Sequence, residues 1–201
     1  MSFPGKPAFK SETLAPGMRV GLYGGSFDPP HAGHVHVART AMKRLGLHRV
    51  WWLASPANPF KACPPAPLDE RLKWIEDAVP EPRMVASGFE ARLPSSRTVD
   101  VIAALQARFP RVRFYWVMGA DGLLELHRWK GWGEIAARVP ICVVSRPGAS
   151  VRARLSPAAR RLAPFRVPPS RAGALGAGPP GWTYLTERLH AHASRDLRRP
   201  A

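Results

Sequence analysis

The feature that most constrains the fold is a series of short apolar runs separated by segments with helical spacing. The runs lie at Arg19–Tyr23, Val50–Ala54, Arg83–Ala86, Phe114–Met118, Ile141–Ser145 and Thr183–Leu185. The helical spacing falls on residues 31–45, 68–79, 99–109, 121–126 and 132–138. Strands that are apolar on both faces are typical of a parallel sheet covered by helices on both sides. The pattern therefore predicts the α/β class, with a doubly wound, mostly parallel sheet that binds ligands at the carboxyl ends of its strands.

The length of 201 residues predicts one domain, which we place at residues 18–201. Residues 1–17 are rich in Pro, Gly and Lys and predict a flexible N-terminal arm. Residues 164–181 are rich in Pro and Gly and predict an irregular connection or a mobile loop. No apolar run reaches the roughly 18 residues of a membrane-spanning helix, and the start lacks the apolar core of a secretory signal. With two cysteines and no paired spacing, we expect a cytoplasmic protein.

A formal net charge of +16 favours anionic partners and raises the question of a nucleic acid. The basic residues, however, never occur in a run longer than two. The sequence also has no paired Cys and His residues and no RNA-binding aromatic motif. We therefore expect small anions at a crevice, and no nucleic acid or membrane as a partner.

The segment Gly24–His34, between the first apolar run and the first helix, carries the chemistry. Gly24 and Gly25 allow close backbone approach to a phosphate. His31 and His34 stand three apart at a helix start, where imidazole can donate hydrogen bonds to an oxyanion without adding negative charge. The segment is neither a GxGxxG dinucleotide loop nor a Walker A loop. No Cys or acid stands at ligand spacing beside the histidines, so we predict no protein-held metal.

This segment, Gly25–His34 (GSFDPPHAGH), resembles the HxGH motif of the nucleotidyltransferase superfamily, in the form found in bacterial nicotinate-nucleotide adenylyltransferases. Four further segments resemble that family in the same order: Asn58–Lys61, Ser96–Asp100, Gly119–Asp121 with Trp129 and Trp132, and Arg146–Pro147. The resemblance spans roughly Val20–Arg198 and implies a Rossmann-like nucleotidyltransferase fold, with a C-terminal segment at about 182–199 that binds the ATP phosphates. Two places depart from the family: Arg97 stands where it has Tyr, and Ala193–Arg198 reads ASRDLR where it has Ser-Ser-Thr-x-Ile-Arg.

The resemblance implies adenylyl transfer from ATP to nicotinate mononucleotide in NAD biosynthesis, with Mg²⁺ carried by ATP. It assigns His31 and His34 to catalysis. It assigns to ATP the residues Gly24, Gly25, Ser26, Phe27, Asp121, Ser194 and Arg198. It assigns to nicotinate mononucleotide the residues Lys61, Thr98, Trp129 and Arg146. A Trp face suits the flat, cationic pyridinium ring, whereas Trp51, Trp52 and Trp116 lie in apolar runs and are expected in the core.

Two other functions remain open from the sequence. The first is another HxGH transferase, such as a phosphopantetheine adenylyltransferase or a cytidylyltransferase. The second is a non-catalytic basic protein that binds nucleotides or nucleic acid, which the altered C-terminal motif would suit. The sequence does not decide the oligomeric state or the preference for the acid over the amide mononucleotide.

Overall fold

The computed structural model describes residues 13–56, 64–145 and 150–186. Their sheet consists of β1 (Arg19–Gly25), β2 (Arg49–Ala54), β3 (Met84–Ser87), β4 (Arg113–Gly119), β5 (Ile141–Val144) and β6 (Trp182–Leu185). The strand order is β3-β2-β1-β4-β5-β6, and every neighbouring pair is parallel. The predicted α/β class is thus confirmed, and the described sheet is parallel throughout rather than mostly so.

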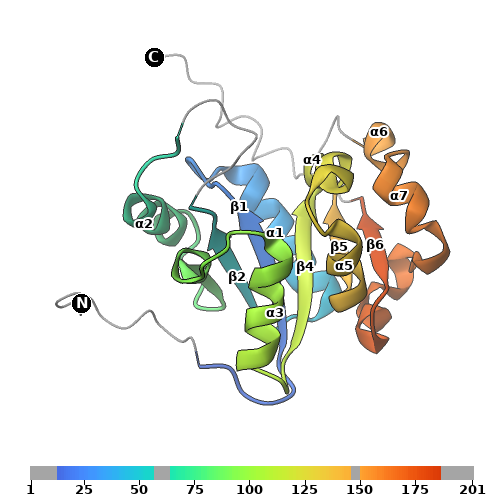
Figure 1. Ribbon diagram of the computed structural model, residues 1–201, viewed down its shortest axis with the longest axis horizontal. Coiled ribbons are helices and arrows are strands. Elements are labelled where there is room, and N and C mark those ends of the chain that lie inside the picture. Colours follow the sequence, from blue (N-terminus) through green and yellow to red (C-terminus); the bar gives the residue numbers. More distant parts are fainter. Residues whose placement is uncertain (1–12, 57–63, 146–149, 187–201) are drawn as a thin grey trace.

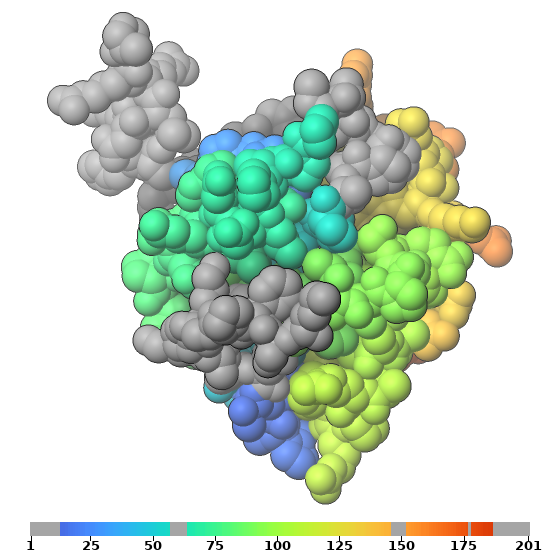
Figure 2. Space-filling view, turned by 60° about the vertical axis from the view of Figure 1, so that its left-hand side comes forward, coloured from blue at the N-terminus to red at the C-terminus, as the bar shows by residue number. Residues whose placement is uncertain are grey.

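Helices cover both faces of the sheet (Figure 1). The α-helices are α1 (Ala32–Leu45), α2 (Leu68–Ala78), α3 (Thr98–Arg108), α4 (Ala120–Glu125), α5 (Trp132–Arg138), α6 (Ser150–Arg154) and α7 (Pro157–Arg161). The 3-10 helices are η1 (Phe89–Arg92), η2 (Leu126–Arg128), η3 (Ala163–Phe165) and η4 (Pro169–Ala177). In Figure 1, α2 lies at one end of the sheet and α6 and α7 at the other. Figure 2 shows the side of the molecule on which α2 and α3 both reach the surface.

Alternate side chains along each strand enter two separate cores, as a doubly wound sheet requires. In β2, Trp51 and Leu53 face the layer that contains α3, α4 and α5, whereas Trp52 and Ala54 face the layer that contains α1 and α2. All four side chains are fully buried. This alternation explains why the strands read as continuous apolar runs in the sequence.

The segment 164–181, predicted as an irregular connection or a mobile loop, contains only short 3-10 helices before β6, with Arg171 non-helical inside η4. It forms η3 and η4, and η4 packs against the α1 layer through Ala172 and Leu175, which are 1% and 2% exposed. Arg44 Nη2 donates to the Pro169 carbonyl at 2.7 Å, and Arg19 Nη2 donates to the Gly173 carbonyl at 2.9 Å. These two arginines satisfy carbonyls that a Pro- and Gly-rich segment leaves without regular partners.

Residues 13–17 of the predicted arm run back along the domain. The Gly17 N–H donates to the Arg111 carbonyl at 2.7 Å, and Leu14 packs against the core on the α3 side. Residues 1–12 lie outside the described part of the chain. The structure thus places the last part of the arm against the turn before β4.

A buried arginine joins three segments at the carboxyl end of the sheet. Arg71, on α2, is 1% exposed. Its Nε donates to the Ala66 carbonyl at 2.7 Å, and its Nη1 donates to the carbonyls of Ser26 and Ser55, each at 2.8 Å. Burial lowers the pKa of Arg71, while the negative charges of Asp28 and Glu90 act in the opposite direction. A guanidinium stays protonated in proteins, so Arg71 fixes the loop after β1 to the end of β2 as a permanent cation.

Glu90, on η1, is one of the two carboxyl groups whose charges act on Arg71. It is 7% exposed and accepts a hydrogen bond from the Ser55 hydroxyl at 3.1 Å. Burial raises the pKa of Glu90 to about 7, against the opposing effects of the Ser55 hydroxyl and the Arg71 charge. Near neutral pH the group therefore exchanges between its neutral and charged forms inside the fold.

We expect Glu90→Gln to change how stability depends on pH. The folded pKa of about 7 lies above the unfolded value, so the folded state holds the proton more tightly. The wild-type chain should therefore lose stability relative to the Gln variant as pH rises from about 4.5 to about 7, by on the order of 1–3 kcal/mol, with no further change above about pH 8. Denaturant unfolding of both proteins at several pH values measures this difference. Glu76→Gln, at an exposed position on α2, is the control, and a wild-type-to-variant difference that does not vary with pH would contradict the prediction.

Candidate active site

A cavity of about 370 Å³ opens at the carboxyl ends of β1 and β4. The strand order reverses between these two strands, because β2 and β3 continue on one side of β1 while β5 and β6 continue on the other side of β4. This is where an open α/β sheet provides a crevice for a ligand. The lining residues are Gly24, Gly25, Ser26, Ser55, Glu90, Ser96, Arg97, Thr98, Trp116, Glu125, Arg128, Trp129 and Lys130.

Gly24 and Gly25 are the last two residues of β1 and pair with Leu53 and Ala54 of β2, so they extend the predicted strand beyond Tyr23. A Cβ on Gly24 would lie 2.6 Å from Cη2 of Trp116. A Cβ on Gly25 would lie 2.9 Å from Cζ of Phe27. The two glycines are therefore needed because aromatic rings close against the strand end, and Gly24 lets Trp116 form one wall of the cavity.

Phe27 carries the positive φ of this loop, at +48°, a backbone conformation that side chains other than Gly seldom adopt. Its ring is 2% exposed and packs against Tyr23 and Trp52, with centroid distances of 5.3 Å and 5.0 Å. The Phe27 side chain is thus part of the core in the α1 layer. Its predicted contact with ATP stays a prediction that can involve only its backbone.

His31 and His34 begin α1 and cap it reciprocally. The Gly33 N–H donates to His31 Nδ1 at 3.1 Å, and the His31 N–H donates to His34 Nδ1 at 3.2 Å. The two ring centroids are 3.9 Å apart. An imidazole that accepts through Nδ1 carries its proton on Nε2 when neutral, so this cap selects the tautomer in which Nε2 is a donor. Both residues follow Ser26 on the same loop but do not line the cavity.

Trp129 and Thr98, which the sequence assigned to one substrate, line the same cavity. Trp129 directly follows η2 and is half-buried; its ring meets Trp116 edge to face, with centroids 6.1 Å apart and planes at 85°. Thr98 is the first residue of α3. The cavity therefore brings together the glycine end of β1 and two residues that lie about 75 and 105 positions later in the sequence.

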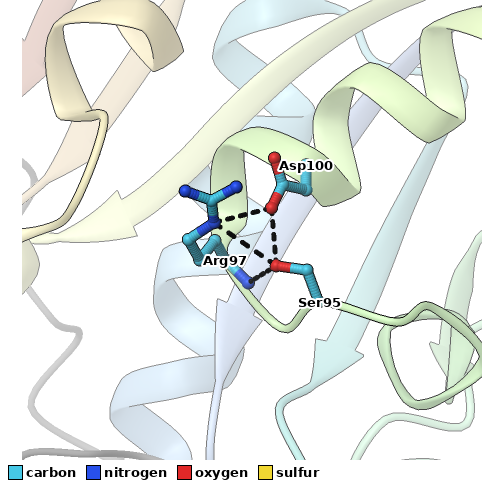
Figure 3. Close-up of polar contacts among 3 residues, drawn as sticks. All are labelled: Ser95, Arg97 and Asp100. Carbon is cyan, nitrogen blue, oxygen red and sulfur yellow. Dashed lines mark hydrogen bonds and ion pairs between the residues drawn. The ribbon is translucent and has the colours of Figure 1, made fainter.

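The turn before α3 is held by a cluster of Ser95, Arg97 and Asp100 (Figure 3). Arg97 Nε donates to Asp100 Oδ2 at 2.7 Å, the Ser95 hydroxyl donates to the same oxygen, and the Arg97 N–H donates to Ser95 Oγ at 3.2 Å. The Ser95 hydroxyl and, next, the Arg97 guanidinium hold the pKa of Asp100 below its ordinary value. The cluster thus stays ionic at neutral pH and fixes the side chain of Arg97 beside the cavity.

The remaining predicted site residues fall elsewhere. Asp121 lies in the first turn of α4, is exposed, and does not line the cavity. Lys61, Arg146, Ser194 and Arg198 lie outside the described residues, so their roles stay predictions.

Several lining residues were not assigned to the site from the sequence: Ser55, Glu90, Ser96, Arg97, Trp116, Glu125, Arg128 and Lys130. Ser55 directly follows β2 and could have been found from its place at the carboxyl end of a predicted strand. Trp116 was correctly expected in the core, where it is 3% exposed, but its ring also reaches the cavity. Glu90 has no sequence signal, because its burial depends on contacts with distant segments.

Across residues 13–56, 64–145 and 150–186, no group of three or more His, Cys, Asp or Glu side chains is arranged to hold a metal ion. In the same part of the chain, no helix combines the length and apolar character needed to cross a membrane.

The family model described as cytidylyltransferase-like matches residues 22–191. A probable nicotinate-nucleotide adenylyltransferase of Ruegeria pomeroyi is 52% identical over 184 residues, which cover 91% of this chain and 86% of that protein. One of Cereibacter sphaeroides, with the same name, is 49% identical over 182 residues, covering 90% and 96%. Among solved structures, the Plasmodium falciparum nicotinic acid mononucleotide adenylyltransferase complexed with NaAD has the same fold, with a TM-score of 0.60 at 14% identity over 86% of this chain and 75% of that one.

The family model covers most of the chain, and the relatives share about half of its residues over nine-tenths of its length. The chain therefore belongs to the cytidylyltransferase-like family and, within it, to the nicotinate-nucleotide adenylyltransferases.

Proposed function

We propose that this chain transfers the adenylyl group of ATP to nicotinate mononucleotide, giving nicotinate adenine dinucleotide and pyrophosphate. The observation that carries the proposal is the lining of one cavity at the β1–β4 switch point. Gly24, Gly25 and Ser26 from the segment expected at ATP, and Thr98 and Trp129 from the segments expected at the mononucleotide, line it together. A cavity lined by both sets is suited to bringing two substrates together in one site.

The reaction makes modest demands on the protein. A phosphate oxygen of the mononucleotide attacks the α-phosphorus of ATP and forms a new P–O bond. The bond from the α-phosphorus to the oxygen that bridges it to the β-phosphorus breaks, and pyrophosphate leaves with the electron pair. The nucleophile is already ionised, so no strong base is needed. The protein must position two anions and stabilise the charge that develops at the α-phosphoryl group.

His31 and His34 supply donors for that charge, with His34 nearest the α-phosphoryl group. The reciprocal cap of α1 supports this role, because it keeps each neutral ring in the form that donates through Nε2. The first turn of α1 contains no acidic residue that would repel a phosphate. The backbone of Gly24–Phe27 adds contacts to ATP from the same loop.

The remaining contacts extend this scheme to both substrates. Trp129 stacks on the pyridinium ring, and Thr98 bonds the pyridine carboxylate. Lys61 and Arg146 bind the phosphate of the mononucleotide, and Asp121 binds a hydroxyl of the adenosine. Ser194 and Arg198 hold the β- and γ-phosphates, for which the planar fork of an arginine is suited.

Mg²⁺ enters as part of the MgATP substrate, bound by phosphate oxygens and water. We place the reaction in the cytoplasm. The low cysteine content and the lack of paired cysteine spacing support this location.

The overall reaction is tested with purified protein, MgATP and nicotinate mononucleotide, with pyrophosphate release as the readout. Phosphopantetheine with ATP, and CTP with phosphocholine, test the other HxGH transferases. We expect pyrophosphate release only from the combination of MgATP and nicotinate mononucleotide. Release with none of the three combinations would favour the non-catalytic nucleotide-binding function instead.

We expect His34→Ala to lower kcat about 10²- to 10³-fold, because one donor to the developing charge is lost. His34→Glu keeps an acceptor for the His31 N–H, so it preserves the helix cap while it removes the donor. Its kcat should be at least as low as that of His34→Ala. His48→Ala is the control, since His48 bonds the Arg19 N–H at the opposite end of β1. Near-normal turnover by a folded His34→Ala protein would rule out this role.

We expect Trp129→Ala to raise the KM for nicotinate mononucleotide roughly ten-fold or more while changing the KM for ATP much less. The loss is that of ring stacking and cation–π attraction with the pyridinium group, worth about 1–2 kcal/mol. Trp129→Phe should retain much of the affinity because it keeps a ring face. Steady-state kinetics with each substrate varied in turn measure both constants, and equal changes in the two KM values would assign Trp129 to packing against Trp116 alone.

A further inference from the structure

The guanidinium of Arg97 is oriented by hydrogen bonds at its Nε atom, which leaves its two terminal nitrogens available to a ligand. Its Nε is occupied by Asp100 Oδ2 at 2.7 Å and, more weakly, by Ser95 Oγ at 3.4 Å. Within the described part of the chain, its two terminal nitrogens have no hydrogen-bond partner. In Figure 3 these nitrogens point away from Ser95. The side chain is 49% exposed and lines the cavity directly beside Thr98.

We propose that Arg97 is a specificity-determining residue that pairs through its terminal nitrogens with the pyridine carboxylate and so selects the acid mononucleotide over the amide. This inference rests on the proposed function. It gives a role to a cavity-lining cation that the sequence motifs assign to neither substrate. A guanidinium matches the two oxygens of a carboxylate with two parallel N–H donors.

The same geometry discriminates against the amide. A carboxamide presents one oxygen acceptor and one NH₂ donor, whereas a guanidinium has donors only. Nicotinamide mononucleotide would therefore set its NH₂ group against an N–H of Arg97, or give up one of the two bonds. Selection thus has an attractive part for the acid and a repulsive part for the amide.

The other cations around the cavity suit this role less well. Lys130 is a point charge on a flexible stem and does not offer a planar pair of donors. Arg128 ends η2, which β4 and α4 separate along the chain from Thr98, the predicted contact of the carboxylate. Arg97 adjoins Thr98 in the chain, so both can meet one carboxylate.

Asp100 is a positioning residue in this scheme. It holds Arg97 Nε and is itself held by the Ser95 hydroxyl, so the guanidinium is restrained before substrate arrives. Restraint of this kind lowers the entropy lost on binding. A purely structural role is the competing explanation, since Arg97 and Asp100 also form an i,i+3 ion pair at the start of α3.

The test compares kcat/KM for nicotinate and nicotinamide mononucleotides in the wild type, Arg97→Gln, Arg97→Lys and Asp100→Ala. Arg97→Gln should lower the acid-to-amide ratio roughly 10- to 100-fold, because it loses the charge and can accept a bond from the amide. The acid-to-amide ratio of Arg97→Lys should lie between those of the wild type and Arg97→Gln. Asp100→Ala should lower the ratio by a smaller factor than Arg97→Gln does. Arg108→Gln, at the last turn of the same helix, should leave the ratio unchanged.

A structural role predicts a different result, in which Arg97→Gln changes both substrates by the same factor. A ratio within about two-fold of wild type for a folded Arg97→Gln protein would overturn the proposal. Calorimetric titration of each protein with nicotinate mononucleotide alone provides a readout besides turnover. If the wild type binds the acid but releases no pyrophosphate, the proposed reaction fails, while weaker binding by Arg97→Gln and unchanged binding by Arg108→Gln would still support the contact. Equal binding by wild type and Arg97→Gln would overturn it.

Discussion

The close approach of Gly24 to Trp116 is the contact on which the site depends. There is no room for a side-chain carbon at Gly24, since a Cβ would lie 2.6 Å from the indole ring. The absence of a side chain lets the Trp116 ring of β4 pack against the end of β1, at the point where the strand order reverses. Trp116 in turn supports Trp129 edge to face at 6.1 Å. The lack of a side chain at Gly24 thus lets the end of β1 pack directly against the Trp116 ring that forms one wall of the cavity.

A second set of contacts fixes the same loop from the other side of the sheet end. Arg71 bonds the carbonyls of Ser26 and Ser55 and connects them to the segment before α2. A buried cation that bonds neutral carbonyls keeps its positive charge uncompensated by a close ion pair. Glu90 is held near that charge but is largely desolvated, so it offsets the charge in a pH-dependent way. Arg71 therefore holds the loop after β1 against the end of β2, and the negative charges of Asp28 and Glu90 act on its guanidinium.

The sequence predicted the fold well because burial on both faces of a parallel sheet leaves a direct pattern in the chain. Each of the six apolar runs became a strand, and the histidine pair was correctly placed at the start of α1. The cavity lining was predicted only where a local motif marked it, as for Gly24, Thr98 and Trp129. Glu90 enters the site through strand order and through its contact with Ser55, and such long-range contacts have no local pattern. The packing of segment 164–181 could not be predicted for a similar reason, because its carbonyls bond Arg19 and Arg44, which lie more than a hundred residues earlier.

The net charge of +16 is therefore not a guide to the local electrostatics of the site. Around the cavity, Arg97, Arg128 and Lys130 stand with Glu90 and Glu125, and Arg97 is partly neutralised by Asp100. A site with mixed signs attracts a phosphate less strongly than a wholly basic one, but it can distinguish groups within one ligand. Nicotinate mononucleotide carries a cationic ring, an anionic carboxylate and a phosphate, so it requires such a mixture. In the Ser95–Arg97–Asp100 cluster, the bonds to Asp100 fix the orientation of the Arg97 guanidinium. In our proposal, this orientation, and not the total charge around the cavity, determines which group of the ligand Arg97 binds.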